Sequence, residues 1–275
     1  MDVAHVGLGW RTVQKLPGWR AAWPDALYWG PVPEGMDVAE LRAFREEFWR
    51  RECEAWDAPV SEANRAKGAA MLAQRKNYLA DWTEARRFAE VVLWFGPGMG
   101  DQLGLLQALG YLGGLPLRLS MAEPDRGFAK RRAVRDEEIA AARELWRLFR
   151  AASRAGFHEG AERQTVFPAM AGAAAGIREL SPDYRNGVDR VQWQLLQAAI
   201  GGKTVLQVVA AALYGEVGDT CFFATLWRMM HGPVPLVRCA DGSAAPRRPA
   251  WDKKKVERTA AGRAVMEGGW APPLA

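Results

Sequence analysis

The sequence contains few of the residues that metal sites, redox motifs and disulfide frameworks require. Its 275 residues include three cysteines and three histidines: Cys53, Cys221, Cys239, His5, His158 and His231. The cysteines form no C-x-x-C motif, and no two histidines stand three or four residues apart, so the sequence has no local metal-ligand spacing. We therefore predict no metal and no other cofactor, and the cysteines indicate a reducing compartment.

Long apolar segments are absent as well. No run of about 18 apolar residues could span a bilayer, and the N-terminus does not resemble a signal peptide. These absences predict a cytoplasmic protein with no membrane partner. The composition, with 49% hydrophobic and 25% charged residues, is typical of a globular protein, and a net charge of +5 is too small to indicate a partner by itself.

Motifs for nucleophilic or nucleotide chemistry are also missing. The chain has no G-x-S-x-G for a serine nucleophile and no Gly-Lys-Ser or Gly-Lys-Thr for a Walker loop. Gly96, Gly98 and Gly100 are spaced G-x-G-x-G, and Asp101 stands where a dinucleotide fingerprint needs its third glycine. The glycine stretch is therefore not a recognised nucleotide motif.

A strand–loop–helix–strand pattern between residues 90 and 120 is the clearest structural signal. The apolar run 91–95 is rich in β-branched and aromatic residues and predicts a buried strand. The glycine loop 96–100 follows, and Asp101 is suited to cap a leucine-rich helix that ends at Gly113. Residues 115–119 predict a second strand, so the whole forms a right-handed βαβ unit with two parallel strands.

The carboxyl end of the first of these strands is where open α/β sheets hold ligands, and it gives our leading site hypothesis. Asp101, Gln102 and His5 are the candidate catalytic residues, acting on a small polar molecule by proton transfer or orientation. The candidate ligand-binding residues come from the glycine loop and from the loop 30–34, which we expect to close the mouth: Gly96, Gly98, Gly100, Pro31 and Glu34. Purely structural roles remain open as well: a cap for Asp101 and a tight turn for the glycines.

The rest of the N-terminal half predicts strands within residues 1–10 and 25–30, and helices over 38–55, 61–88 and 136–155. Residues 123–132 are polar and basic and predict a loop. A change of composition at residues 156–160 predicts a linker. We expect an α/β domain over 1–122, a connecting helix and linker over 123–160, and a second domain over 161–275.

The last third has a different pattern. It predicts a helix within 165–179, further helices over 189–200, 204–213 and from Asp219, a hairpin from strands 235–238 and 254–258, and a helix over 260–267. Three short helices followed by a hairpin and a last helix is the order of a winged helix-turn-helix. The predicted fold class is thus an α/β domain with a small, largely parallel sheet, followed by a mostly α domain of winged-helix type.

Positive charge gathers on the predicted hairpin. If the protein instead binds nucleic acid, the basic residues expected to do so are Arg247, Arg248, Lys253, Lys254, Lys255 and Arg258. The helix that would read bases, from Asp219 to His231, is heavily apolar, which favours packing instead. The same domain could also serve a ligand-sensing regulator, bind a protein or peptide, or form a homo-oligomer.

Several short motifs together resemble a bacterial pairing of two families, the domain of unknown function numbered 1835 followed by the one numbered 3658. The matching pieces run in the family's order from residue 28 to 268: 30–33, 41–48, 90–95, 101–107, 179–187, 218–219, 235–237 and 260–263. The chain departs from the families' pattern at 5–10, where a Gly-Asp-Ser turn is expected, and at the glycine loop. The resemblance implies architecture only.

Overall fold

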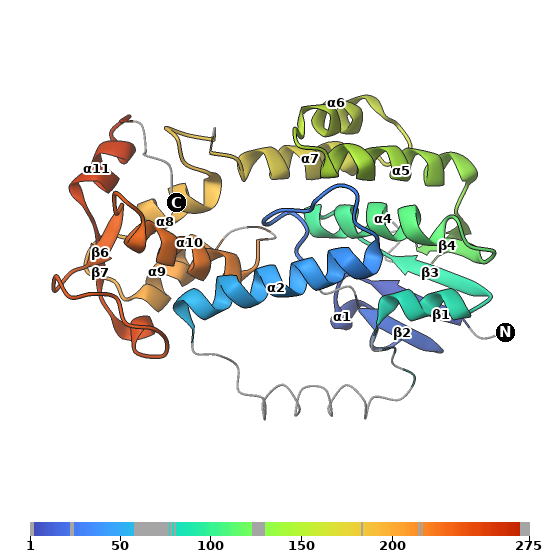
Figure 1. Ribbon diagram of the computed structural model, residues 1–275, viewed down its shortest axis with the longest axis horizontal. Coiled ribbons are helices and arrows are strands. Elements are labelled where there is room, and N and C mark those ends of the chain that lie inside the picture. The colour runs from blue at the N-terminus through green and yellow to red at the C-terminus, as the bar shows by residue number, and fades with distance from the viewer. Residues whose placement is uncertain are drawn as a thin grey trace. The chain divides into compact units, whose positions relative to one another are not determined.

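The protein is described by a computed structural model that covers residues 3–22, 25–57, 77, 79, 81–122, 130–182, 184–213, 215 and 217–269 (Figure 1). The chain forms two compact units. Unit 1 comprises Met1–Ala43 and Val60–Gly176, and unit 2 comprises Phe44–Pro59 and Ile177–Ala275. No helix within the described ranges is both long and apolar enough to cross a membrane.

Unit 1 is built on a five-stranded sheet in the order β2-β1-β3-β4-β5. The strands are β1 (Val3–Gly7), β2 (Trp19–Ala22), β3 (Glu90–Trp94), β4 (Arg118–Ala122) and β5 (Arg131–Ala133). The first four strands are mutually parallel, and β5 pairs antiparallel with β4. The prediction of an α/β fold with a largely parallel sheet is confirmed.

The predicted βαβ unit is present as β3, α4 (Met99–Leu112) and β4, with β3 and β4 parallel. Helix α4 begins earlier than expected because Gly98, in extended conformation, is its N-cap. The prediction that Asp101 is the cap is therefore wrong. Asp101 lies in the first turn, where its negative charge interacts favourably with the positive end of the helix dipole. The second strand lies at 118–122 instead of 115–119.

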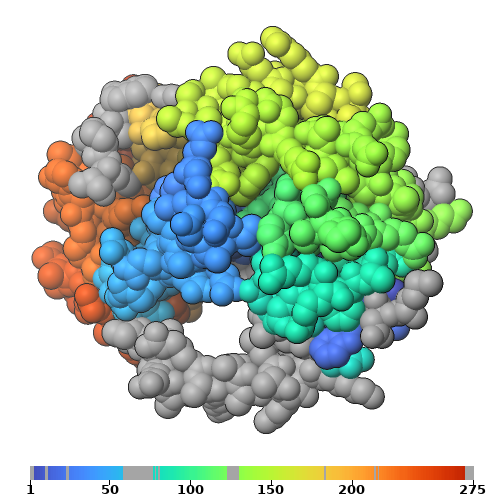
Figure 2. Space-filling view, turned by 45° about the vertical axis from the view of Figure 1, so that its right-hand side comes forward, coloured from blue at the N-terminus to red at the C-terminus, as the bar shows by residue number. Residues whose placement is uncertain are grey.

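Helix α4 lies between the sheet and the helix α5 (Asp136–Arg150), and its leucines are buried almost completely. In Figure 2, the residues of α4, in green, lie against those of α5, in lighter green. Helix α6 (Ala155–Arg163) packs on α5, and α7 (Met170–Glu179) follows it in the chain. Since α4 is covered on both sides, it is apolar all round, as a buried helix must be.

Helix α2 (Val38–Trp56) matches its prediction and runs from unit 1 into unit 2. Asp37 Oδ1 accepts hydrogen bonds from the backbone N–H groups of Ala39 and Glu40, and the Glu40 carboxylate accepts one from Asp37 N–H. This reciprocal capping box fixes the start of the helix. Unit 1 also contains the short helix α1 (Trp10–Val13) and the 3-10 helix η1 (Trp82–Arg87). Most of the predicted helix 61–88 lies outside the described residues.

Three local predictions are wrong. Residues 25–30 form turns instead of a strand, and the sheet edge is made by β2 instead. Residues 131 and 132, expected in a loop, belong to β5 because this segment pairs with the end of β4. Residues 156–160, expected as a linker, lie inside α6, where Phe157 is fully buried and contacts Phe149 of α5.

Unit 2 contains the expected helices, hairpin and last helix. They are α8 (Arg190–Ala198), α9 (Val205–Ala212), α10 (Asp219–His231), β6 (Val237–Cys239), the 3-10 helix η3 (Trp251–Lys253), β7 (Val256–Arg258) and α11 (Ala260–Met266). Asp189 and Thr204 cap α8 and α9, and β6 and β7 pair antiparallel.

The core of unit 2 is formed around α10. Eight of its residues, including Phe222, Phe223 and Met229, are buried. Trp251 is fully buried and contacts Phe223 and Trp56, the last residue of α2. The sequence-based expectation that the helix from Asp219 is a packing helix agrees with this burial.

Candidate functional site

A cavity of about 420 Å³ opens in unit 1 where β3 and β4 end, beside the first turns of α4. The carboxyl ends of parallel strands meet at this edge, which is where the sequence predicts a site. The lining is mostly apolar and comes from Phe95, Pro97, Gln102, Leu105, Met121, Ala122, Arg132, Val166, Phe167, Pro168 and Ala169. Such a volume and lining suit a small molecule with an apolar body.

Gln102 is the one uncharged polar side chain among the described residues that line this cavity. Its side chain is 5% exposed, and its Nε2 donates a hydrogen bond of 2.7 Å to the carbonyl oxygen of Gly96. Its Oε1 is buried and receives no hydrogen bond from any described residue. Gln102 is thus held by its nitrogen, and its oxygen is enclosed by surrounding atoms, out of reach of a molecule in the cavity.

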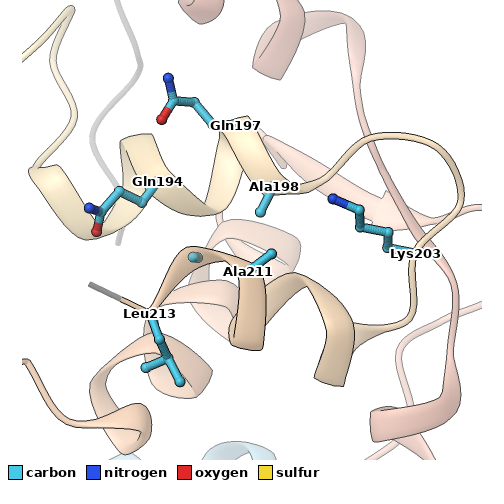
Figure 3. Close-up of a pocket in the computed structure, with 7 residues that line it drawn as sticks. Gln194, Gln197, Ala198, Lys203, Ala211 and Leu213 are labelled. Atoms are coloured by element: carbon cyan, nitrogen blue, oxygen red, sulfur yellow. The ribbon is translucent and has the colours of Figure 1, made fainter. Parts of the chain in front are cut away.

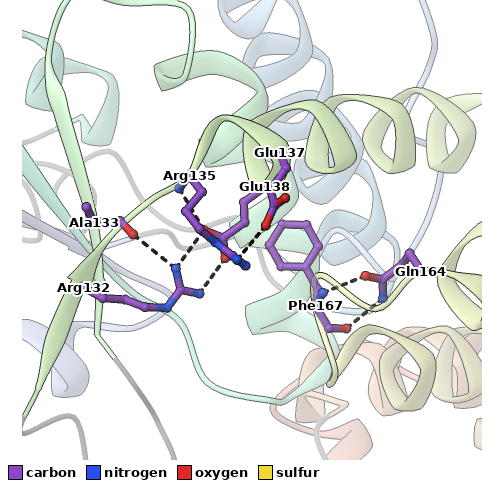
Figure 4. A network of polar contacts seen from close by, with 7 residues as sticks. All are labelled: Arg132, Ala133, Arg135, Glu137, Glu138, Gln164 and Phe167. Carbon is purple, nitrogen blue, oxygen red and sulfur yellow. Dashed lines mark hydrogen bonds and ion pairs between the residues drawn. The ribbon is translucent and has the colours of Figure 1, made fainter.

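One wall of the cavity is the segment 166–169, and Gln164 holds it in place (Figure 4). Gln164 Oε1 accepts a hydrogen bond from Phe167 N–H at 2.6 Å, and its Nε2 donates to the Phe167 carbonyl at 2.8 Å. The amide therefore satisfies both backbone groups of Phe167, as a neighbouring strand would. Phe167 is 4% exposed and keeps a fixed position.

The lining also includes Arg132 of β5, whose guanidinium is paired with Glu138 of α5 (Figure 4). The two Glu138 oxygens accept hydrogen bonds of 2.8 and 2.5 Å from Arg132, and Glu138 also accepts one from Arg135 N–H. Burial favours the neutral acid, but the hydrogen bonds from Arg132 and from the Arg135 backbone outweigh it and lower the pKa of Glu138. The carboxylate is charged and neutralises Arg132.

His5 lies on β1 and is 5% exposed, and two hydrogen bonds occupy its ring. Trp94 Nε1 donates to His5 Nδ1 at 2.9 Å, and the ring also bonds the backbone of Pro17. Since proline has no N–H, the ring donates to the Pro17 carbonyl. Burial lowers the pKa of His5, so the imidazole is neutral near pH 7.

The glycine loop is compact. The N-terminal turn of α4 is covered at Gly100, where a Cβ would lie 3.3 Å from Leu8 and from Tyr28. The Asp101 carboxylate packs over Gly96, since its atoms lie 3.6 to 4.0 Å from the place of a Cβ there. Neither Asp101 nor His5 is among the described residues that line the cavity, so of the three candidate catalytic residues only Gln102 lines it.

The loop 30–36 is tied to α5 and to the turn before α6. Arg150 donates to the carbonyls of Pro33 and Met36 at 2.7 and 2.8 Å, and Arg154 donates to that of Gly30 at 3.5 Å. Pro31 and Glu34 are exposed and do not belong to the described lining of the cavity. The contacts favour a fixed connection here over a closing loop.

The basic residues of unit 2 divide into two groups. Lys254 pairs with Asp241 at 2.8 Å, and Arg248 bonds Asp252 at 3.0 Å and lies over the Phe223 ring. These two residues therefore have structural roles. For the remaining four, the described residues supply no carboxylate partner: Arg247, Lys253, Lys255 and Arg258.

Unit 2 also has an open groove of about 330 Å³ between α8 and α9 (Figure 3). Gln194 and Gln197 line it from α8, Ala211 and Leu213 from α9 and its end, and Lys203 from the connecting turn. Leu213 is 44% exposed. The groove is open to solvent, so its polar groups can bond water.

Sequence reasoning missed the cavity walls. Arg132, Gln164 and Phe167 stand far from the glycine loop in the chain, and no local motif marks them. The signal that was available is Pro168, because the residue before a proline avoids the helical conformation, which indicates a loop at Phe167.

The comparisons with known proteins add no family. No family model, curated protein or solved structure was found to match the chain. In the described part of the chain, no group of three or more histidine, cysteine, aspartate or glutamate residues could hold a metal ion. The resemblance to the two bacterial families stays a prediction.

Proposed function

We propose that unit 1 binds a small, largely apolar molecule in the cavity at the carboxyl ends of β3 and β4, as the ligand-sensing part of the protein. The observation that carries the proposal is the cavity itself, about 420 Å³ enclosed mostly by apolar side chains, with one wall fixed by the two hydrogen bonds of Gln164 to Phe167. The apolar walls would supply affinity by burial.

The contacts of His5 and Asp101, the other two candidate catalytic residues, favour ligand binding over catalysis. The His5 ring uses both nitrogens, on Trp94 of β3 and on the backbone of Pro17 before β2, and Asp101 packs over Gly96. An enzyme that uses Asp101, Gln102 and His5 together would need His5 to give up its contacts with Trp94 and Pro17. Catalysis in the same cavity is therefore the less favoured alternative to ligand binding.

The test uses indole as a probe and the methyl resonance of Met121, which lines the cavity, in protein labelled with ¹³C-methyl methionine. Indole is expected to shift this signal with saturation, and Ala169→Leu, which adds bulk at the wall, should weaken binding about tenfold or more. Ala211→Leu makes the same change in the groove of unit 2 and is the matched control. If indole leaves Met121 unmoved, or if only Ala211→Leu weakens binding, the proposal is wrong.

We propose a second candidate function for unit 2, nucleic-acid binding by a hairpin of winged-helix type. It is supported by Lys253, Lys255 and Arg247, which are exposed and lack carboxylate partners within the described ranges. The burial of α10 speaks against base reading by that helix, so the contacts would be to phosphates. A DNA complex that weakens steeply with salt and is lost in Lys253→Ser/Lys255→Ser would support it, and no complex at low salt would remove it.

A further inference from the structure

The polar side chains that line the cavity of unit 1 are Gln102 and Arg132. The amide nitrogen of Gln102 donates to the Gly96 carbonyl and its oxygen is enclosed, so this residue is nearly hidden from a bound molecule. Arg132 is the one charged side chain among the described residues of the lining, and it is 37% exposed. Arg132 is therefore the polar side chain that a bound molecule can approach.

The positive charge of Arg132 is compensated inside the protein. The carboxylate of Glu138 is fully buried and accepts hydrogen bonds of 2.8 and 2.5 Å from the two terminal nitrogens of Arg132 (Figure 4). Such a two-point pair is the strongest arrangement of an arginine and a carboxylate. The neighbouring Arg135 pairs in turn with Glu137 at 2.6 Å. Two cations thus face two carboxylates at this wall.

A charge-balanced wall decides which ligands gain free energy on binding. An anionic ligand gives up its water at the apolar walls, and Arg132 returns little because Glu138 already accepts from both of its terminal nitrogens. A neutral ring has no such hydration to lose, and it gains from burial against side chains such as Phe95 and Phe167.

We propose that Glu138 determines the charge of the ligand: by pairing with Arg132 it restricts the cavity to uncharged, apolar, ring-sized molecules. Glu138 is not among the described residues that line the cavity, so it acts on the ligand only through Arg132. This inference rests on the proposed function, since it names the class of ligand for that cavity and the residue that selects it.

Nitrobenzene and benzoate test the charge selectivity in the unmodified protein. They have nearly the same planar shape, but at pH 7 benzoate is an anion and nitrobenzene is neutral. Titration of both against the Met121 methyl signal should give a dissociation constant about tenfold lower, or lower still, for nitrobenzene. Equal affinities, or tighter binding of benzoate, would overturn the inference while leaving the proposed function intact. If neither these probes nor indole moves Met121, the proposed function itself has failed.

Glu138→Gln tests the role of the residue itself. The change keeps the length of the side chain and an acceptor oxygen but removes one negative charge beside Arg132. Benzoate should then bind about tenfold more tightly than in the unmodified protein, whereas the dissociation constant of nitrobenzene should stay within about twofold.

Glu137→Gln is the matched control. It makes the same change of charge one residue away on α5, at a carboxylate that is 60% exposed and pairs with Arg135, and it should leave both dissociation constants unchanged. An unchanged selectivity in Glu138→Gln, or the same gain for benzoate in Glu137→Gln, would overturn the inference. The comparison of the two probes in the unmodified protein stands even if Glu138→Gln fails to fold.

Discussion

The cavity of unit 1 and the groove of unit 2 have similar volumes, about 420 and 330 Å³, but their polar groups are in different states. In the cavity, Gln102 is 5% exposed and its oxygen has no partner among the described residues. In the groove, Gln194 is half-buried and Gln197 is exposed, so water can reach both when no ligand is bound. The difference teaches that similar volumes can have different linings: the cavity has mostly apolar walls, whereas the groove presents its polar groups to water.

Two helix glycines, one in each unit, differ in the space around them. At Gly262 of α11, in unit 2, a Cβ would lie 2.1 Å from the carbonyl oxygen of Leu236. Gly172 of α7 has nothing within 4 Å of the same position. The first glycine is required by the space between helix and hairpin, whereas the second is not.

The largest effect is therefore expected from Gly262→Ala. The new methyl group collides with backbone, which cannot move aside as a side chain can, and the loss should be about 3 kcal/mol in the free energy of unfolding. Chemical unfolding followed by tryptophan fluorescence measures it. Gly172→Ala is the control and should be neutral or gain about 0.5 kcal/mol from helix propensity. Equal stability of the two variants would contradict the claim that the backbone at Leu236 leaves no room for a side chain at position 262.

A second prediction concerns pH and unit 2. Burial raises the pKa of Asp189, the N-cap of α8, to about 6. Because the folded protein then holds this proton more tightly than the unfolded chain, the free energy of unfolding falls as the pH rises from about 4 to 6. Asp189→Asn keeps a capping side chain and removes the charge, so it should gain about 2 kcal/mol at pH 7.

The measurement for Asp189 is the difference in unfolding free energy between variant and parent at pH 4 and pH 7. The variant's advantage should appear only at the higher pH. An advantage that is the same at both values would contradict the raised pKa and point to a simple packing effect.

A smaller effect is expected from Gln164→Ala in unit 1. Losing both bonds to Phe167 should lower the free energy of unfolding by about 1 to 2 kcal/mol and weaken indole binding several-fold, because the wall 166–169 is released. Gln197→Ala, in the groove of unit 2, should change neither quantity. Indole affinity that survives Gln164→Ala would mean that Phe167 does not shape the site.

The sequence predicts the parts of the molecule that depend on local pattern. The β3–α4–β4 unit follows from an apolar run, a glycine loop and leucines at helical spacing, and the caps of α2, α8 and α9 follow from Asp37, Asp189 and Thr204. It does not predict β2, a four-residue edge strand that starts directly after Pro17 and Gly18 and exists because β1 pairs with it.

The candidate site was predictable in place but not in composition. The cleft follows from the rule for parallel sheets, and Gln102 follows from its position after the glycine loop. Arg132 and Phe167 reach the cavity through antiparallel pairing and through a side-chain clamp, neither of which a local motif reveals. His5 occupies the sheet as expected, but its two ring contacts depend on Trp94 and Pro17, which no local pattern connects to it.

A crystal structure of the full chain with bound indole tests the central claim most directly. The ring should lie in the cavity of unit 1, against Phe95, Leu105 and Phe167. Indole bound in the groove beside Gln194 and Gln197, or bound nowhere in the described part of the chain, would contradict the claim that the apolar cavity of unit 1 is the ligand site.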